Sequence, residues 1–145
     1  MPGQVAAVSR NEVYSFSKPN RDAITLLTGL GVEGDVHAGE AIRHQFRMTY
    51  EPDLPNLRQA HLMHEELFDE LALKGFKVSA GHLGENINDF RKGLLGEVFA
   101  MDPASGEFTF KSGVMAVVRR GGTVRPDDSA RVELPPLPHR PLERV

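Results

Sequence analysis

The chain has 145 residues, 40% of them hydrophobic and 26% charged, and a formal net charge of −3. This length predicts a single domain, residues 1–145, built around one core. The negative charge argues against nonspecific nucleic-acid binding, which needs a basic excess to neutralise phosphates. No apolar run reaches the ~20 residues of a membrane span, and the first residues lack the basic and apolar regions of a signal peptide. A cytoplasmic protein without a membrane partner is therefore expected.

The sequence contains no cysteine. This excludes disulfides, thiolate nucleophiles and zinc sites built from cysteine. Glycine and proline number 14 and 10 and are spread along the whole chain. Such spacing predicts short regular elements separated by turns.

In chain order, short apolar runs bounded by turn residues predict strands at 4–8, 23–27, 114–118 and 131–134. A four-residue spacing of apolar side chains predicts the main helix at 63–74, which Gly75 would end. A second, shorter helix is predicted at 93–100, before Asp-Pro. Asp127 in a Pro-Asp-Asp sequence predicts a type I turn without a positive φ. Together these elements predict a mainly β fold with few helices.

Two glycine-flanked loops carry polar side chains suited to a site. In the loop 31–39, Asp35 and His37 are two residues apart, and on an extended backbone they would point the same way and share a ligand or a metal. Alternatively, Asp35 accepts hydrogen bonds from backbone N–H groups and caps a turn. In the loop 81–87, Glu85 and Asn86 could orient a substrate or accept a proton. Equally, both side chains could hold the loop backbone in shape.

A third group of residues is a local excess of cationic donors: Arg43, His44, Arg47, Arg58 and His61. Guanidinium groups suit phosphates and oxyanions because their donors form a planar fork. The alternative is a solvated basic face that pairs with nearby glutamates and adds little stability. Arg58 and Gln59 are the stronger candidates, since they lie in the run 56–61 just before the predicted main helix.

The glycine loops, the Asn-Leu-Arg-Gln-Ala-His run at 56–61 and the Gly-Val-Met-Ala-Val-Val run at 113–118 occur in an order and spacing that resemble the MOSC family. These domains are related to the C-terminal part of molybdenum cofactor sulfurases. The resemblance implies a β-barrel that binds molybdenum cofactor (molybdopterin) or a molybdenum species, in a family linked to pyridoxal phosphate, sulfur carriage and reduction of N-hydroxylated compounds. It implies the following cofactor-binding residues, all of which except Arg43 are expected to converge on one cleft: Asp35, His37, Arg43, Arg58, Gln59, His61, Glu85 and Asn86.

The chain departs from the family after Ile87. Similar proteins continue there with several strands and an Asn-Pro-Cys loop, whereas here the run 89–95 follows directly and resembles the segment after that cysteine. The resemblance therefore implies an internal deletion. Removing strands from a closed sheet leaves unpaired edges. An open or incomplete barrel is expected, or a homodimer in which a second copy supplies the missing neighbours.

Three functions follow from these observations. The first is a MOSC-type protein that binds a small-molecule or cofactor ligand. The second is a noncatalytic binding module that has lost the reactive cysteine. The third is a metal-dependent hydrolase using Asp35, His37 and Glu85, although the sequence has no two-histidine helical metal motif. Because a soft metal is usually tethered by a thiolate, binding without turnover is predicted.

Overall fold

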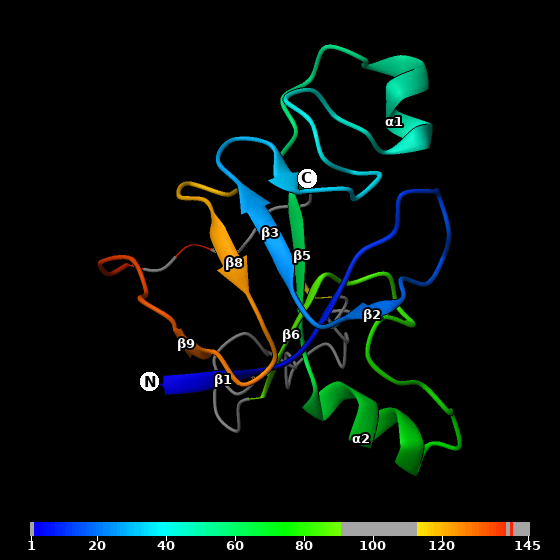
Figure 1. The fold of residues 1–145 in the computed structure, drawn as a ribbon, viewed down its shortest axis with the longest axis vertical. Helices are drawn as coiled ribbons and strands as arrows, with labels where there is room; N and C mark the ends of the chain where they lie inside the picture. Colours follow the sequence, from blue (N-terminus) through cyan, green and yellow to red (C-terminus); the bar gives the residue numbers. More distant parts are fainter. Residues whose placement is uncertain (1, 91–112, 139, 141–145) are drawn as a thin grey trace.

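The computed structural model describes residues 2–90, 113–138 and 140. Within them the chain forms short strands and two short helices (Figure 1). The elements, in chain order, are β1 (Pro2–Ser9), β2 (Asn20–Arg21), β3 (Ile24–Leu27), β4 (Gly31–Val32), α1 (Gln45–Tyr50), β5 (Ala60–His64), α2 (Glu66–Leu73), β6 (Ile87–Phe90), β7 (Val114–Ala116), β8 (Gly122–Val124) and β9 (Ser129–Arg131). The predicted fold class, mainly β with few helices, is confirmed.

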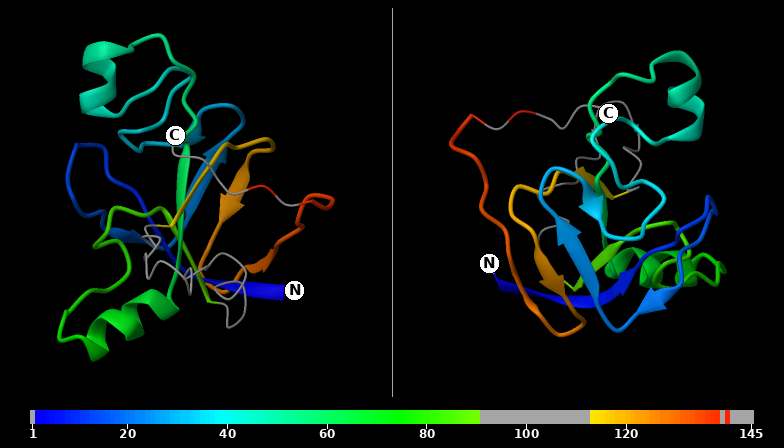
Figure 2. Two further views of the ribbon diagram at one scale, coloured as in Figure 1. Left: turned by 180° about the vertical axis from the view of Figure 1, so that it is seen from behind. Right: turned by 45° about the horizontal axis from the view of Figure 1, so that its top comes forward.

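The strands form two sheets. The larger one has the order β2-β1-β6-β5-β7, with β9 also paired to β1, and the smaller one has the order β4-β3-β8. All pairs are antiparallel except β5 with β6, which run parallel. Neither strand order closes on itself within the described ranges, so the expected open barrel is confirmed there. Figure 2 shows the smaller sheet lying across the larger one.

A bulge in β1 turns its valines toward the core. The pairing of β1 with β6 shifts register between Val5 and Ala7, so one extra residue stands opposite the partner strand. Strict alternation would place Val5 and Val8 on opposite faces. Because of the bulge, both are buried in the same cluster.

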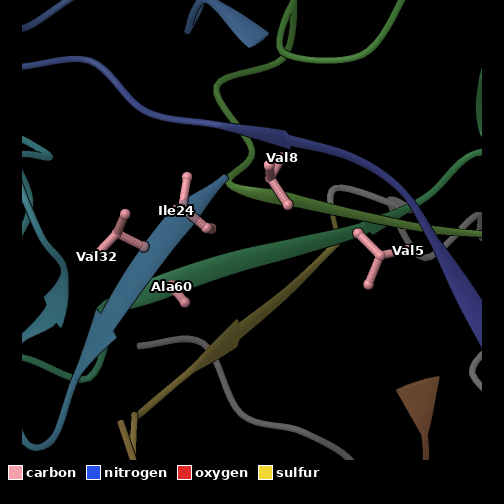
Figure 3. Packing of buried hydrophobic residues seen from close by; sticks show 5 residues of the cluster. All are labelled: Val5, Val8, Ile24, Val32 and Ala60. Carbon is pink, nitrogen blue, oxygen red and sulfur yellow. The ribbon is translucent and has the colours of Figure 1, made fainter. Parts of the chain in front are cut away.

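The core joins the two sheets. Val5, Val8 and Ala60 from the larger sheet pack with Ile24 and Val32 from the smaller sheet (Figure 3). Each fully buried valine or isoleucine contributes about 1.5–3 kcal/mol relative to an exposed one. This small cluster fixes β4 and β5. The predicted residues Asp35, His37 and Arg43 follow β4, and Arg58 and Gln59 lie directly before β5.

The predicted strands were located with mixed accuracy. The strands predicted at 4–8 and 23–27 are β1 and β3, and the one at 114–118 is β7, which ends at Ala116. The strand predicted at 131–134 is displaced, because β9 spans Ser129–Arg131. Its position is set by pairing with β1, where Gln4 lies opposite Ser129. The helix predicted at 93–100 lies outside the described residues.

The main helix begins later than predicted. Residues 60–64 form β5, and α2 starts at Glu66 and ends at Leu73. Met63, which the spacing assigned to the helix, is buried in β5, opposite Asn88 of β6. Pairing with β6 and β7 on both sides satisfies the backbone of these residues and overrides the helical pattern. Neither helix in the described ranges is long and apolar enough to cross a membrane.

The turn at Asp127 was also predicted wrongly, because Asp127 has a φ of 70°. Asp127 donates its N–H to the carbonyl of Val5, and Val5 donates its N–H to the carbonyl of Asp128. This pairing with β1 requires the left-handed backbone, which aspartate tolerates better than most residues.

Candidate functional site

Asp35 lies at the centre of the predicted site and is buried. Its Oδ2 accepts from the Lys18 ammonium at 2.9 Å, from the Asn86 amide at 3.0 Å and from the Asn11 N–H at 3.3 Å. Its Oδ1 accepts from the N–H of His37 at 3.0 Å and lies 3.3 Å from His37 Nδ1. The turn-capping alternative for Asp35 is therefore the one that the structure shows.

The surroundings of Asp35 keep it ionised. Burial alone would raise its pKa, but the hydrogen bond from His37 and the charge of Lys18 outweigh burial, so the pKa lies well below its ordinary value. An ionised carboxylate only accepts hydrogen bonds, which makes His37 Nδ1 the donor. His37 Nε2 is then the ring nitrogen available to a ligand, on a side chain that is 25% exposed.

Asn86 brings the two glycine loops together. Its amide donates to Asp35 and to the carbonyl of Ser9, and its Oδ1 accepts from the N–H of His61 at 3.1 Å. Residues from both loops and from β5 therefore meet at one place. Glu85, in contrast, turns back on its own loop, where its carboxylate accepts from the N–H groups of Gly81 and Leu83.

Gln59 locks three segments together. Its amide nitrogen donates to the carbonyls of Gly29 and Asn56, and its Oε1 accepts from the N–H of Val118 at 2.8 Å. The backbone of Gln59 also lies close to Gly31. Gly31 has a φ of +120°, and a Cβ there would lie 2.5 Å from the Gln59 carbonyl oxygen, so only glycine fits without strain. Four of the predicted side chains therefore form hydrogen bonds to backbone groups or to each other, and they position the site instead of facing a ligand. They are those of Asp35, Gln59, Glu85 and Asn86.

The cationic donors do gather. His44 lies within electrostatic reach of Arg58, His37 and Arg47; burial, followed by these three charges, lowers the pKa of His44. His44 Nδ1 is buried and has no hydrogen-bond partner among the described residues. We call His37, His44, Arg47 and Arg58 the cationic cluster. It presents donors from the β4–α1 loop, from α1 and from the α1–β5 loop to one region, an arrangement suited to a phosphate or another oxyanion.

A small hollow of about 80 Å³ lies beside this cluster. Two guanidinium-bearing residues and four apolar ones line it: Arg47, Arg58, Ile42, Leu54, Pro55 and Leu57. A wider, more open hollow of about 330 Å³ lies near Lys18 and His82, and none of the predicted site residues lines it. The smaller hollow is the better candidate because charged donors border an apolar wall.

The two remaining predicted residues, Arg43 and His61, belong neither to the cationic cluster nor to the lining of the small hollow. Arg43 is exposed, and its carbonyl accepts from the Tyr14 hydroxyl. The Tyr14 ring meets the His37 ring edge-on, with centroids 5.7 Å apart. His61 is partly buried in β5, opposite Met115 of β7.

Sequence reasoning missed Lys18, Asn11, Asn56 and Tyr14. Asn56 carried a signal, since it opens the run 56–61, and its amide donates to the carbonyls of His37 and Gly39. No sequence signal pointed to Lys18, because a single lysine in a polar loop is ordinary. Its burial follows from the fold, which places it against Asp35.

The hydrolase hypothesis does not fit this geometry. Its three residues do not form a common centre, since the Glu85 carboxylate is held by its own loop backbone. Among the described residues, no group of three or more histidine, aspartate or glutamate side chains is arranged to hold a metal ion.

Comparisons with known proteins bear on the fold. No model of a known protein family matches the chain, and no curated protein matches it in sequence. Its fold is similar to that in the crystal structure of the YuaD protein from Bacillus subtilis, with a TM-score of 0.69 and 18% identity, over 89% of this chain and 94% of that chain. At this identity the likeness shows a shared fold alone.

Proposed function

We propose that this chain is a MOSC-like binding module, cytoplasmic as its sequence predicts, that holds the anionic part of molybdenum cofactor or a related species without turning it over. The observation that carries the proposal is the cationic cluster beside the small hollow. Asp35, the carboxylate that contacts His37, is already paired with Lys18, so it does not neutralise the rest of the cluster.

The donors fit a phosphate or molybdate group. The Arg47 and Arg58 guanidinium groups would make charge-assisted hydrogen bonds to the anion. His37 Nε2 and His44 Nδ1 would approach it from the loop between β4 and α1. Ile42, Leu54 and Leu57 would contact an apolar part of the ligand. When bound, molybdenum cofactor supplies oxygen or sulfur transfer at its metal. The protein's share is to bind and orient the anion.

Titration calorimetry with molybdate, with inorganic phosphate and with isolated molybdopterin tests binding. Arg58→Gln and Arg47→Gln should each weaken the affinity by roughly 10- to 100-fold, because a charge-assisted hydrogen bond contributes about 1.5–3 kcal/mol. Arg119→Gln is the matched control, since Arg119 is exposed in the turn before β8. Equal losses in Arg119→Gln and Arg58→Gln, or no binding of any of the three anions, would overturn the proposal.

Turnover is tested separately. With no cysteine in the chain, no thiolate is present to carry sulfur or ligate a soft metal. Purified protein supplied with molybdenum cofactor should therefore not reduce an N-hydroxylated substrate, whereas a variant with the family's cysteine-bearing segment restored should gain activity. Equal rates for the two proteins would show that the thiolate argument is wrong.

A further inference from the structure

His44 carries a buried ring nitrogen without a hydrogen-bond partner. Its Nδ1 is covered by protein atoms, and none of the described residues donates to it or accepts from it. In a neutral imidazole with its proton on Nε2, such a nitrogen is only an acceptor, whereas a proton on Nδ1 would need an acceptor of its own. A buried donor without an acceptor is costly, so the empty site favours the neutral ring.

The charges around His44 favour the same state. They come from three segments: His37 lies in the β4–α1 loop, Arg47 in α1 and Arg58 in the α1–β5 loop. Burial, followed by the charges of Arg58, His37 and Arg47, holds the pKa of His44 below its ordinary value. Protonation of His44 would add a further positive charge to a region that already has several.

An oxyanion held by the cationic cluster would reverse both effects. Its oxygen atoms would supply the acceptor that a proton on His44 Nδ1 needs. A dianion would also balance the charges of the Arg47 and Arg58 guanidinium groups, whereas a monoanion would leave one of them unbalanced. No compensation comes from Asp35, the carboxylate that contacts His37, because it is paired with Lys18.

We infer that His44 adjusts the charge of the site to that of its ligand: the ring is neutral in the empty site and takes up a proton when a dianionic oxyanion binds. The anion is the one that we propose for the cationic cluster, so this role of His44 rests on that function. His44 then determines the preference of the site for dianions over monoanions.

Proton uptake makes the affinity depend on pH. If binding raises the pKa of His44, protonation must strengthen binding by the same factor, since the coupling is reciprocal. The affinity for a dianion therefore rises as the pH falls from the pKa of His44 in the complex to its pKa in the empty site, and it is constant below that range.

Titration calorimetry with molybdate at several pH values tests this coupling. Molybdate keeps two negative charges near neutral pH, and its affinity should be about tenfold higher at about pH 6 than at about pH 8, because a rise of one pKa unit corresponds to a factor of ten. Perrhenate has the same tetrahedral shape and a single charge, so its affinity should change by less than about threefold. Repeating the molybdate titration in buffers with different ionisation enthalpies should show the uptake of a proton.

Two variants assign the effect to a residue. His44→Gln keeps an N–H donor but does not titrate, so its affinity for molybdate should no longer depend on pH. His82→Gln is the matched control, since His82 is exposed and lines the wider hollow instead of the cationic cluster. NMR spectra of the native chain should show the His44 ring titrating at higher pH in the molybdate complex than in the empty protein.

The outcomes separate this role of His44 from the proposed function. Molybdate binding that does not change with pH, or a pH dependence that persists in His44→Gln, would overturn the inference and leave the proposed function intact. An equal pH dependence for perrhenate would overturn the role of His44 in the preference for dianions. A chain that binds molybdate at no pH would overturn both the inference and the proposed function.

Discussion

The donors around Asp35 come from three separate parts of the chain. Asn11 and Lys18 lie in the β1–β2 loop, His37 lies in the loop after β4, and Asn86 precedes β6. A buried carboxylate with these partners holds three loops in one arrangement. The orientation of His37, and with it the position of its Nε2 within the cationic cluster, depends on Asp35 remaining charged.

Replacing Asp35 with asparagine should destabilise the fold by about 3–5 kcal/mol, because the buried Lys18 ammonium loses its counter-charge. The Lys18 and Asp35 side chains are 4% and 2% exposed, so solvent does not compensate for the loss. Urea unfolding followed by circular dichroism measures the change. Glu133→Gln is the control, because it breaks an ion pair with Arg131 whose side chains are 80% and 73% exposed. Equal effects of the two substitutions would contradict the role given to Asp35.

Stability should fall in acid through the same residue. The pKa of Asp35 is lowered in the folded state, against about 3.9 in an unfolded chain. Its contribution is therefore complete above about pH 4 and is lost as the pH falls from there toward the folded pKa. Thermal unfolding between pH 2 and 7 should show a steeper acid loss in the native chain than in Asp35→Asn. Parallel curves would assign the acid sensitivity to other carboxylates.

The boundary between β5 and α2 shows what the sequence could and could not predict at the scale of elements. Apolar spacing correctly identified a helix that includes Leu67, Phe68 and Leu71. It did not show that Met63 belongs to a strand, because that follows from pairing with β6 and β7, which come later in the chain. β2, β4 and β8 are too short for any periodicity to identify, and only their partners define them.

Gly31 at the start of β4 lets this strand lie close to Gln59, the residue directly before β5. Gly31→Ala should lose about 2–5 kcal/mol, since the left-handed backbone strains alanine and its Cβ would meet the Gln59 carbonyl. Gly75→Ala is the matched control. Its φ is +86°, but nothing lies within 4 Å of the added Cβ, so only the backbone strain of about 1–2 kcal/mol is expected. Urea unfolding compares the two variants, and an equal loss would show that the approach of Gln59 is unimportant.

At the scale of the whole molecule, composition and turn spacing predicted a mainly β protein, and the resemblance to MOSC domains predicted an open barrel. Neither predicted that Ile87–Phe90 forms β6, between β1 and β5 in the larger sheet. This segment begins where the resemblance to MOSC domains led us to expect an internal deletion. Its central place follows from backbone pairing on both sides, and the sequence of four residues carries no such information.

The position of β1 also affects how the protein forms during synthesis. β1 is synthesised before its partners β6 and β9, and 125 positions separate Gln4 of β1 from Ser129 of β9, with which it pairs. At about 5–20 residues per second, β1 waits on the order of ten seconds for its last partner. Ribosome-bound chains arrested before residue 129 emerges should therefore be digested readily by protease, whereas chains with β9 outside the exit tunnel should resist. Equal resistance of the shorter chains would mean that β1 and β6 suffice, and that β9 joins a sheet which has already folded.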